Sequence, residues 1–114
     1  MSEMLPRTTN RPLNFEHGEA IGMSHRWGNG QYCSILTKAG IVGCGIYDLK
    51  TAAEFGQAIA IIKGTPAKPL VEPEDLLTTR IVGVTPKAAS LGIQIGMSGR
   101  EAVELMLQSQ DDSA

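Results

Sequence analysis

The chain has little of what would assign a protein to a class at once. Aromatic residues make up 4% of its 114 residues and cysteines number two, so the core must be aliphatic and a disulfide framework is excluded. Ten basic residues against twelve acidic ones provide no basic stripe of the kind that binds nucleic acid. There is neither an apolar run of about 18 residues nor the apolar stretch of a secretion signal. We therefore expect a cytoplasmic protein that neither crosses a membrane nor binds nucleic acid.

What is present is typical of one globular domain. Hydrophobic residues make up 42% of the chain and charged residues 19%, and the length suits a single domain. Residues 1–12 carry two prolines and no periodicity, which predicts a flexible tail that only a neighbouring subunit would order. We expect a domain over 13–108 and a second flexible tail over 109–114.

The order of patterns predicts an α+β fold, in which antiparallel strands come first and an amphipathic helix comes last. Between them, short helices and strands are mixed. The expected strands lie within 13–26 and at 31–37, 41–47, 58–62, 80–84 and 93–95, with turns or loops at 27–30 and 65–73. The expected helices begin at the capping boxes of Thr51 and Ser98 and at the prolines Pro73 and Pro86.

The turn between the strands at 31–37 and 41–47 decides how the two cysteines face. A two-residue loop at 38–39 places Cys33 opposite Cys44 on one face, and a three-residue loop places them on opposite faces. Gly40 favours the longer loop, because such loops often need a positive φ. We expect free thiols.

The strand at 41–47 has no polar face, and the preceding strand carries apolar residues on both sides. A strand that is apolar on both sides must be covered on both sides. In so short a chain its own helices can provide one cover, and a second copy of the sheet is the expected other. The alternative is a strand that lies wholly inside one subunit.

Two segments resemble a known family. The segment 91–102, LGIQIGMSGREA, is similar to the C-terminal motif of the DUF1805 (YunC-like) family of bacteria and archaea, and 40–48, GIVGCGIYD, fits its glycine–cysteine–glycine–aspartate pattern. The similarity spans about 13–107, although the proline-rich loop at 65–73 departs from the family pattern. The resemblance implies a small α+β domain that tetramerises through an N-terminal β-sheet region, and it implies no reaction.

The clearest candidate ligand site is formed by Ser98, Gly99 and Arg100. These residues resemble the nucleophile elbow G-x-S-x-G, but arginine replaces the last glycine, and the capping box explains Ser98 fully. Arg100 stands in the first turn of a helix, where the helix dipole disfavours a cation. It either helps helix amides to bind a small carboxylate or phosphate, or it pairs with an acid such as Glu101, Asp48 or Glu54.

The remaining candidates are Cys44 and Asp48. Cys44 lies between two glycines, which allow close approach, and it is either a reactive thiol or a core residue; Asp48 is either an acid or a helix cap. Neither cysteine forms a close-spaced ligand pair with a histidine, so we expect no metal. The glycine spacings match neither a phosphate loop nor a dinucleotide fingerprint, so we expect no cofactor.

The sequence therefore leaves three functions open. The first is a homo-oligomer with a binding or structural role that holds a small anion near Arg100. The second is an enzyme with a Cys44 thiol site at a subunit interface. The third is an interaction subunit of a larger complex.

Overall fold

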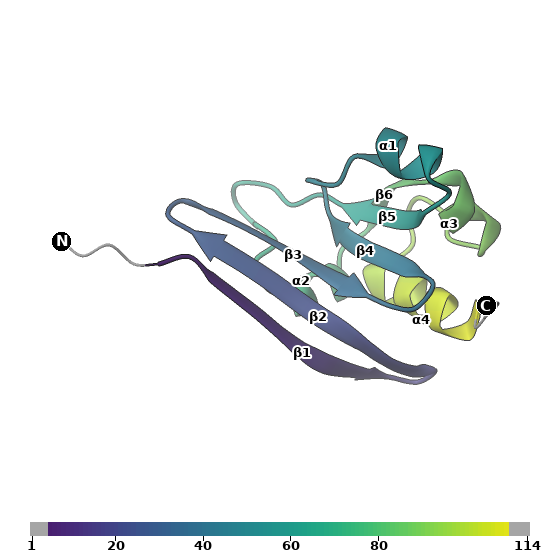
Figure 1. Cartoon of the computed structure of the whole chain (residues 1–114), viewed down its shortest axis with the longest axis horizontal. Helices are drawn as coiled ribbons and strands as arrows, with labels where there is room; N and C mark the ends of the chain where they lie inside the picture. The colour runs from purple at the N-terminus through teal and green to yellow at the C-terminus, as the bar shows by residue number, and fades with distance from the viewer. Residues whose placement is uncertain (1–4, 110–114) are drawn as a thin grey trace.

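The structure is a computed structural model that describes residues 5–109. Its elements are β1 (Arg7–Phe15), β2 (Gly18–Trp27), β3 (Gly30–Leu36), β4 (Gly40–Cys44), α1 (Leu49–Glu54), β5 (Ala58–Ile62), α2 (Pro73–Leu77), β6 (Ile81–Val84), α3 (Pro86–Ser90) and α4 (Gly99–Ser109) (Figure 1). The predicted α+β class is confirmed. Of the two predicted tails, 1–4 and 110–114 lie outside the described residues.

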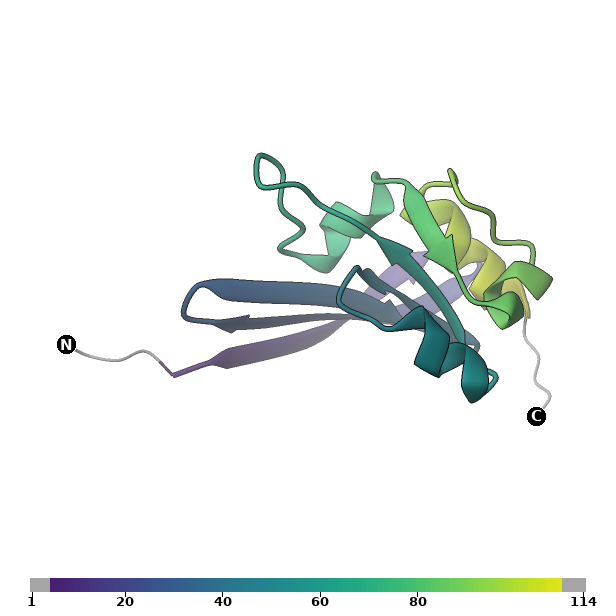
Figure 2. The ribbon, with the colours of Figure 1, turned by 90° about the horizontal axis from the view of Figure 1, so that it is seen from above.

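Within residues 5–109, six strands form one sheet in the order of the sequence. The chain β1–β2–β3–β4 is antiparallel, β5 runs parallel to β4 after a crossover through α1, and β6 is antiparallel to β5. The helices α2 and α4 lie against one side of the sheet, and α1 lies on the other (Figure 2). We call the side of the sheet under α2 and α4 the core face, and the opposite side of β1–β4 the open face.

The hydrophobic core lies between the core face and the helices. The predicted capping box starts α4: the Glu101 amide donates to Ser98 Oγ at 3.1 Å, and the Ser98 amide donates to the Glu101 carboxylate at 2.9 Å. The helix then buries its apolar stripe against the sheet. The largest fully buried hydrophobic side chains are Ile35, Val42, Ile62, Leu76, Ile81, Ile93, Val103 and Met106.

The prediction of a tail over 1–12 is wrong from Arg7 onward, because β1 begins there and pairs with β2 along its whole length. The strand was missed because its residues are mostly polar and it contains Pro12. An edge strand tolerates both features, since half of its backbone groups have no strand partner and one side of it faces solvent.

The preference for a three-residue hairpin loop is also wrong. The register pairs Leu36 with Ile41, so the loop is 38–39 and Cys33 lies opposite Cys44. Thr37 stabilises this tight loop, because its hydroxyl accepts hydrogen bonds from the amides of Ala39 and Gly40 at 3.1 and 3.0 Å. Gly40 serves another purpose: a Cβ there would lie 2.1 Å from the carbonyl oxygen of Ala58, so glycine lets β4 approach β5.

The start of α1 differs from the prediction, because Asp48 rather than Thr51 is the N-cap. The Asp48 carboxylate accepts hydrogen bonds from the Lys50 amide at 3.0 Å and from the Thr51 hydroxyl at 2.6 Å. Asp48, three residues before Thr51, therefore caps the helix and also binds the Thr51 side chain.

One predicted strand is shorter than expected, and another is absent. The strand at 41–47 ends at Cys44, and 93–95 forms no strand. The chain instead loops round the start of β6, where the amide of Ile81 donates to Met97 and its carbonyl accepts from Gly96. The other predicted helices and strands are confirmed, including the end of α3 at a glycine with positive φ, Gly92.

Candidate functional site

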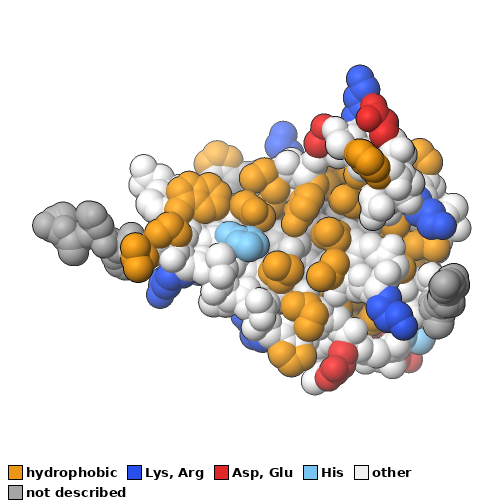
Figure 3. Space-filling model, viewed as in Figure 1, with side chains coloured by type: hydrophobic (Ala, Val, Ile, Leu, Met, Phe, Trp, Pro, Cys, Tyr) orange, Lys and Arg blue, Asp and Glu red, His pale blue; other side chains and the backbone are white. Residues whose placement is uncertain are grey.

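The open face carries an apolar patch that no helix of the described residues covers (Figure 3). Successive side chains of a strand point to opposite sides, so the strand register determines which residues belong to the patch. Three of its hydrophobic side chains remain well exposed: Ile21 (39%), Leu36 (40%) and Trp27 (45%). The patch consists of Ile21, Met23, His25, Trp27, Tyr32, Ser34, Leu36 and Ile41.

Aromatic side chains gather on this face, although the chain has few of them. Its one tryptophan and both its tyrosines lie here. The Tyr32 ring is 4.7 Å from that of His25, 5.9 Å from that of Trp27 and 6.4 Å from that of Tyr47. Tyr47 also covers Gly43, where a Cβ would lie 2.4 Å from its ring. Tryptophan and tyrosine are enriched where proteins bind one another.

None of the residues in the patch is Lys, Arg, Asp or Glu. Charged residues are likewise depleted at the centres of protein–protein interfaces. Around the patch, Figure 3 shows charged side chains mainly at the periphery of this view. The composition of the patch is therefore that of an interface centre rather than of ordinary surface.

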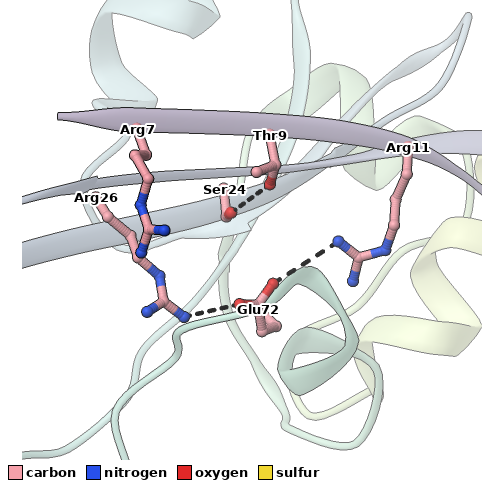
Figure 4. A pocket seen from close by; sticks show the side chains of 6 residues that line it. All are labelled: Arg7, Thr9, Arg11, Ser24, Arg26 and Glu72. Carbon is pink, nitrogen blue, oxygen red and sulfur yellow. Dashed lines mark hydrogen bonds and ion pairs between the residues drawn. The ribbon is translucent and has the colours of Figure 1, made fainter. Parts of the chain in front are cut away.

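A second feature lies on the core face, beside the start of α2. It is a depression of about 310 Å³ that we call the arginine pocket, lined by Arg7, Thr9, Arg11, Ser24, Arg26 and Glu72 (Figure 4). Arg26 donates to the Glu72 carboxylate at 2.7 Å, and the Arg11 guanidinium lies 3.8 Å from its other oxygen. Arg11 also bonds Glu74 at 2.6 Å, which holds the pKa of that carboxyl below its ordinary value.

At the candidate site of Ser98, Gly99 and Arg100, protein groups already occupy several donors. Ser98 and Glu101 bond each other in the capping box, and the Gly99 amide donates to the Thr79 carbonyl at 2.9 Å. Arg100 has no carboxylate partner within residues 5–109; its guanidinium lies over the Phe15 ring, 5.6 Å from the centroid. The anion site at these three residues stays a prediction.

The two cysteines are free and buried on the core face, as predicted for their thiol state. Burial, together with the neighbouring Cys44, raises the pKa of Cys33 to about 12. Asp48, the other catalytic candidate, is exposed and caps α1, and the hydrogen bond from Thr51 lowers its pKa. The structure gives both Cys44 and Asp48 structural positions, and a catalytic role for either stays a prediction.

Sequence reasoning missed a cluster at the turn between β1 and β2. There Glu16, His17 and Glu104 bring potential ligand atoms within 4.8 Å of one another. The Glu104 carboxylate accepts hydrogen bonds from the amides of Glu16 and His17 at 3.0 and 3.1 Å, and His17 Nδ1 lies 2.6 Å from it. These bonds tie the turn to α4, and no sequence spacing indicates them.

No helix within residues 5–109 is long and apolar enough to cross a bilayer. The cytoplasmic location stays a prediction.

The fold and the open face together define a small α+β domain with an uncovered aromatic patch. Residues 43–106, more than half of the chain, match the family described as "Domain of unknown function (DUF1805)". The chain therefore belongs to that family, as its two motifs indicated.

Among solved structures, the chain is similar to that described as "Crystal Structure of a Protein of Unknown Function TA1206 from Thermoplasma acidophilum". The TM-score is 0.79, and the alignment covers 93% of this chain and 99% of that one at 18% identity. At this identity the likeness shows the fold alone. No curated protein matches the chain.

Proposed function

We propose that this protein is a homo-oligomer with a binding or structural role, whose subunits associate through the open face. The observation that carries the proposal is the exposure of Ile21, Trp27 and Leu36 within one patch that contains no Lys, Arg, Asp or Glu. Burying such side chains is favourable by about 25 cal/mol for each Å² removed from water. A tetramer is the expected assembly, in line with the family resemblance.

A second copy of the chain suits this face better than an unrelated partner does. A two-fold interface brings the same patch of each subunit together, so any charge at its centre would meet its own sign. The patch has no such charge.

Native mass spectrometry and sedimentation velocity at micromolar concentration test the assembly. Wild-type chain is expected to be oligomeric, and the emission of its single tryptophan, Trp27, should shift to the blue as the concentration rises. Leu36→Arg should yield monomers, because it would bury an unpaired charge in each copy of the interface. Ile95→Arg is the matched control, since Ile95 is 66% exposed and lies outside the open face.

A monomeric wild-type chain would refute the proposal. An open face that then retained a different protein from the native host would favour an interaction subunit of a larger complex. Dissociation by Ile95→Arg to the same extent as by Leu36→Arg would place the interface elsewhere.

Anion binding near Arg100 is the second part of the proposal, and the uncompensated charge of its guanidinium favours it. The cation–π contact with Phe15 orients the side chain without neutralising it. Arg100→Ala should weaken the binding of inorganic phosphate, measured by calorimetry, and leave the oligomer intact. Unchanged phosphate binding in this variant would refute the proposed anion site.

A further inference from the structure

The arginine pocket lies on the core face, so its occupant is independent of any association through the open face. Arg7, Thr9 and Arg11 project from β1, and Ser24 and Arg26 project from β2, all on the same side of the sheet (Figure 4). Glu72, which precedes α2, forms the remaining wall. We propose that this pocket binds the carboxylate group of a small organic acid.

The first observation is a pair of like charges. The register places Arg7 directly opposite Arg26, and in Figure 4 both side chains extend toward the side of Glu72. Like charges opposite each other destabilise a sheet. Glu72 compensates Arg26 at 2.7 Å, whereas Arg7 has no carboxylate partner within residues 5–109. Two adjacent strands therefore hold two guanidinium groups together with only one acid between them.

The second observation is a hydroxyl proton without an acceptor. Thr9 Oγ1 and Ser24 Oγ lie 2.7 Å apart between the arginines, and Ser24 is buried. Each hydroxyl carries one proton, and their mutual hydrogen bond uses one of the two. The other has no acceptor within residues 5–109, so it is available to a ligand oxygen.

The charges of the pocket indicate the class of ligand. Glu74 neutralises the charge of Arg11, and Glu72 neutralises that of Arg26. The charge of Arg7 is therefore in excess. The Asp75 carboxylate faces the backbone amides of 71 and 72 instead. One negative charge therefore neutralises the pocket, and a planar carboxylate accepts two parallel bonds from a guanidinium fork. Glu72 already shows how a carboxylate sits between Arg11 and Arg26.

An amide NMR titration of the full chain with sodium propionate, at constant ionic strength and in a buffer free of carboxylate and phosphate, tests the site. The amides of Thr9, Ser24 and Arg26 should shift and saturate with an affinity on the order of millimolar. Arg7→Gln should weaken binding at least about tenfold, because a charge-assisted pair is lost. Glu72→Gln should strengthen binding several-fold, because it removes the competing carboxylate of the chain itself.

Lys38→Gln is the matched control, since Lys38 is an exposed cation in the loop between β3 and β4. It should bind propionate as the wild type does. The proposal is overturned if the shifts do not saturate, if Lys38→Gln weakens binding as much as Arg7→Gln, or if Glu72→Gln fails to strengthen it. Saturation by inorganic phosphate but not by propionate overturns the carboxylate class. Unchanged circular dichroism spectra of the variants show that folding is not the cause.

Discussion

The two sides of β1–β4 are built by the same strands and differ in what covers them. Ile35 and Leu36 are neighbours in β3, and the first is fully buried on the core face while the second is 40% exposed on the open face. Both are large aliphatic residues in extended backbone. The difference shows that the fate of an apolar strand residue depends on segments far away, here α2 and α4, rather than on the strand itself.

The largest expected effect separates the two faces directly. Ile35→Ala should lower the free energy of unfolding by about 2–5 kcal/mol, because it leaves a cavity in a packed core. Leu36→Ala should cost less than about 1 kcal/mol in the single subunit, because that site is half exposed. Urea denaturation of both variants, at a protein concentration low enough to keep the chain monomeric, measures the contrast. Equal losses would mean that the open face is covered within one chain.

A smaller effect is expected at Gly43, which the Tyr47 ring covers on the open face. Gly43→Ala should cost about 1–3 kcal/mol, because its methyl group would collide with the Tyr47 ring. In a Tyr47→Ala background the same substitution should cost much less, and thermal or urea unfolding of the double-mutant cycle gives the difference. If the cost is the same in both backgrounds, the ring does not shield that part of the face.

A third effect concerns the tie between the β1–β2 turn and the core-face helix α4. Partial burial raises the pKa of Glu104, but hydrogen bonds from His17 and from two backbone amides outweigh it, so the pKa lies below the ordinary value of 4.5. A lowered pKa stabilises the fold above the ordinary value, and this stability is lost as the pH falls through the lowered one.

Glu104→Ala should therefore lower the free energy of unfolding by about 1–2 kcal/mol at neutral pH, through the lost hydrogen bonds. The difference from wild type should shrink once the pH falls below 4.5, as unfolding curves over a pH series would show. Glu54→Ala is the control, because Glu54 is exposed and makes no side-chain hydrogen bond within residues 5–109. A difference independent of pH would contradict this role for Glu104.

The smallest expected effect is chemical. Cys33, buried on the core face with a pKa of about 12, and its buried neighbour Cys44 should hardly react with iodoacetamide near neutral pH until the chain is unfolded. Mass spectrometry of the alkylated protein counts the modified thiols. Rapid labelling of Cys44 in the folded chain would instead support the enzyme hypothesis.

Much of the fold was predictable because local signals were strong. The capping box of Ser98, the prolines that start α2 and α3, and the isoleucine run of β5 each determine an element within a few residues. β1 was not predictable in this way, since its polar residues become a strand only through pairing with β2. Gly40 misled the hairpin prediction for a similar reason, because the contact that requires glycine comes from β5.

The candidate sites divide along the same line. The sequence predicted that the hairpin at 31–47 has apolar residues on both sides. In the structure, one of these sides is exposed as part of the open face. The arginine pocket was invisible, because Arg7, Arg26 and Glu72 are far apart in the sequence and meet only through strand pairing and the placement of the loop before α2.

By itself, the sequence determined the class of fold, the aliphatic core, the family and the need for cover on both sides of a hairpin. These follow from composition and from periods of a few residues, which act locally. Only the tertiary structure decided which side stays open, where the tryptophan and tyrosines gather, and that three arginines and Glu72 line one pocket. Those features arise from contacts between distant segments, whose register and packing no local pattern encodes.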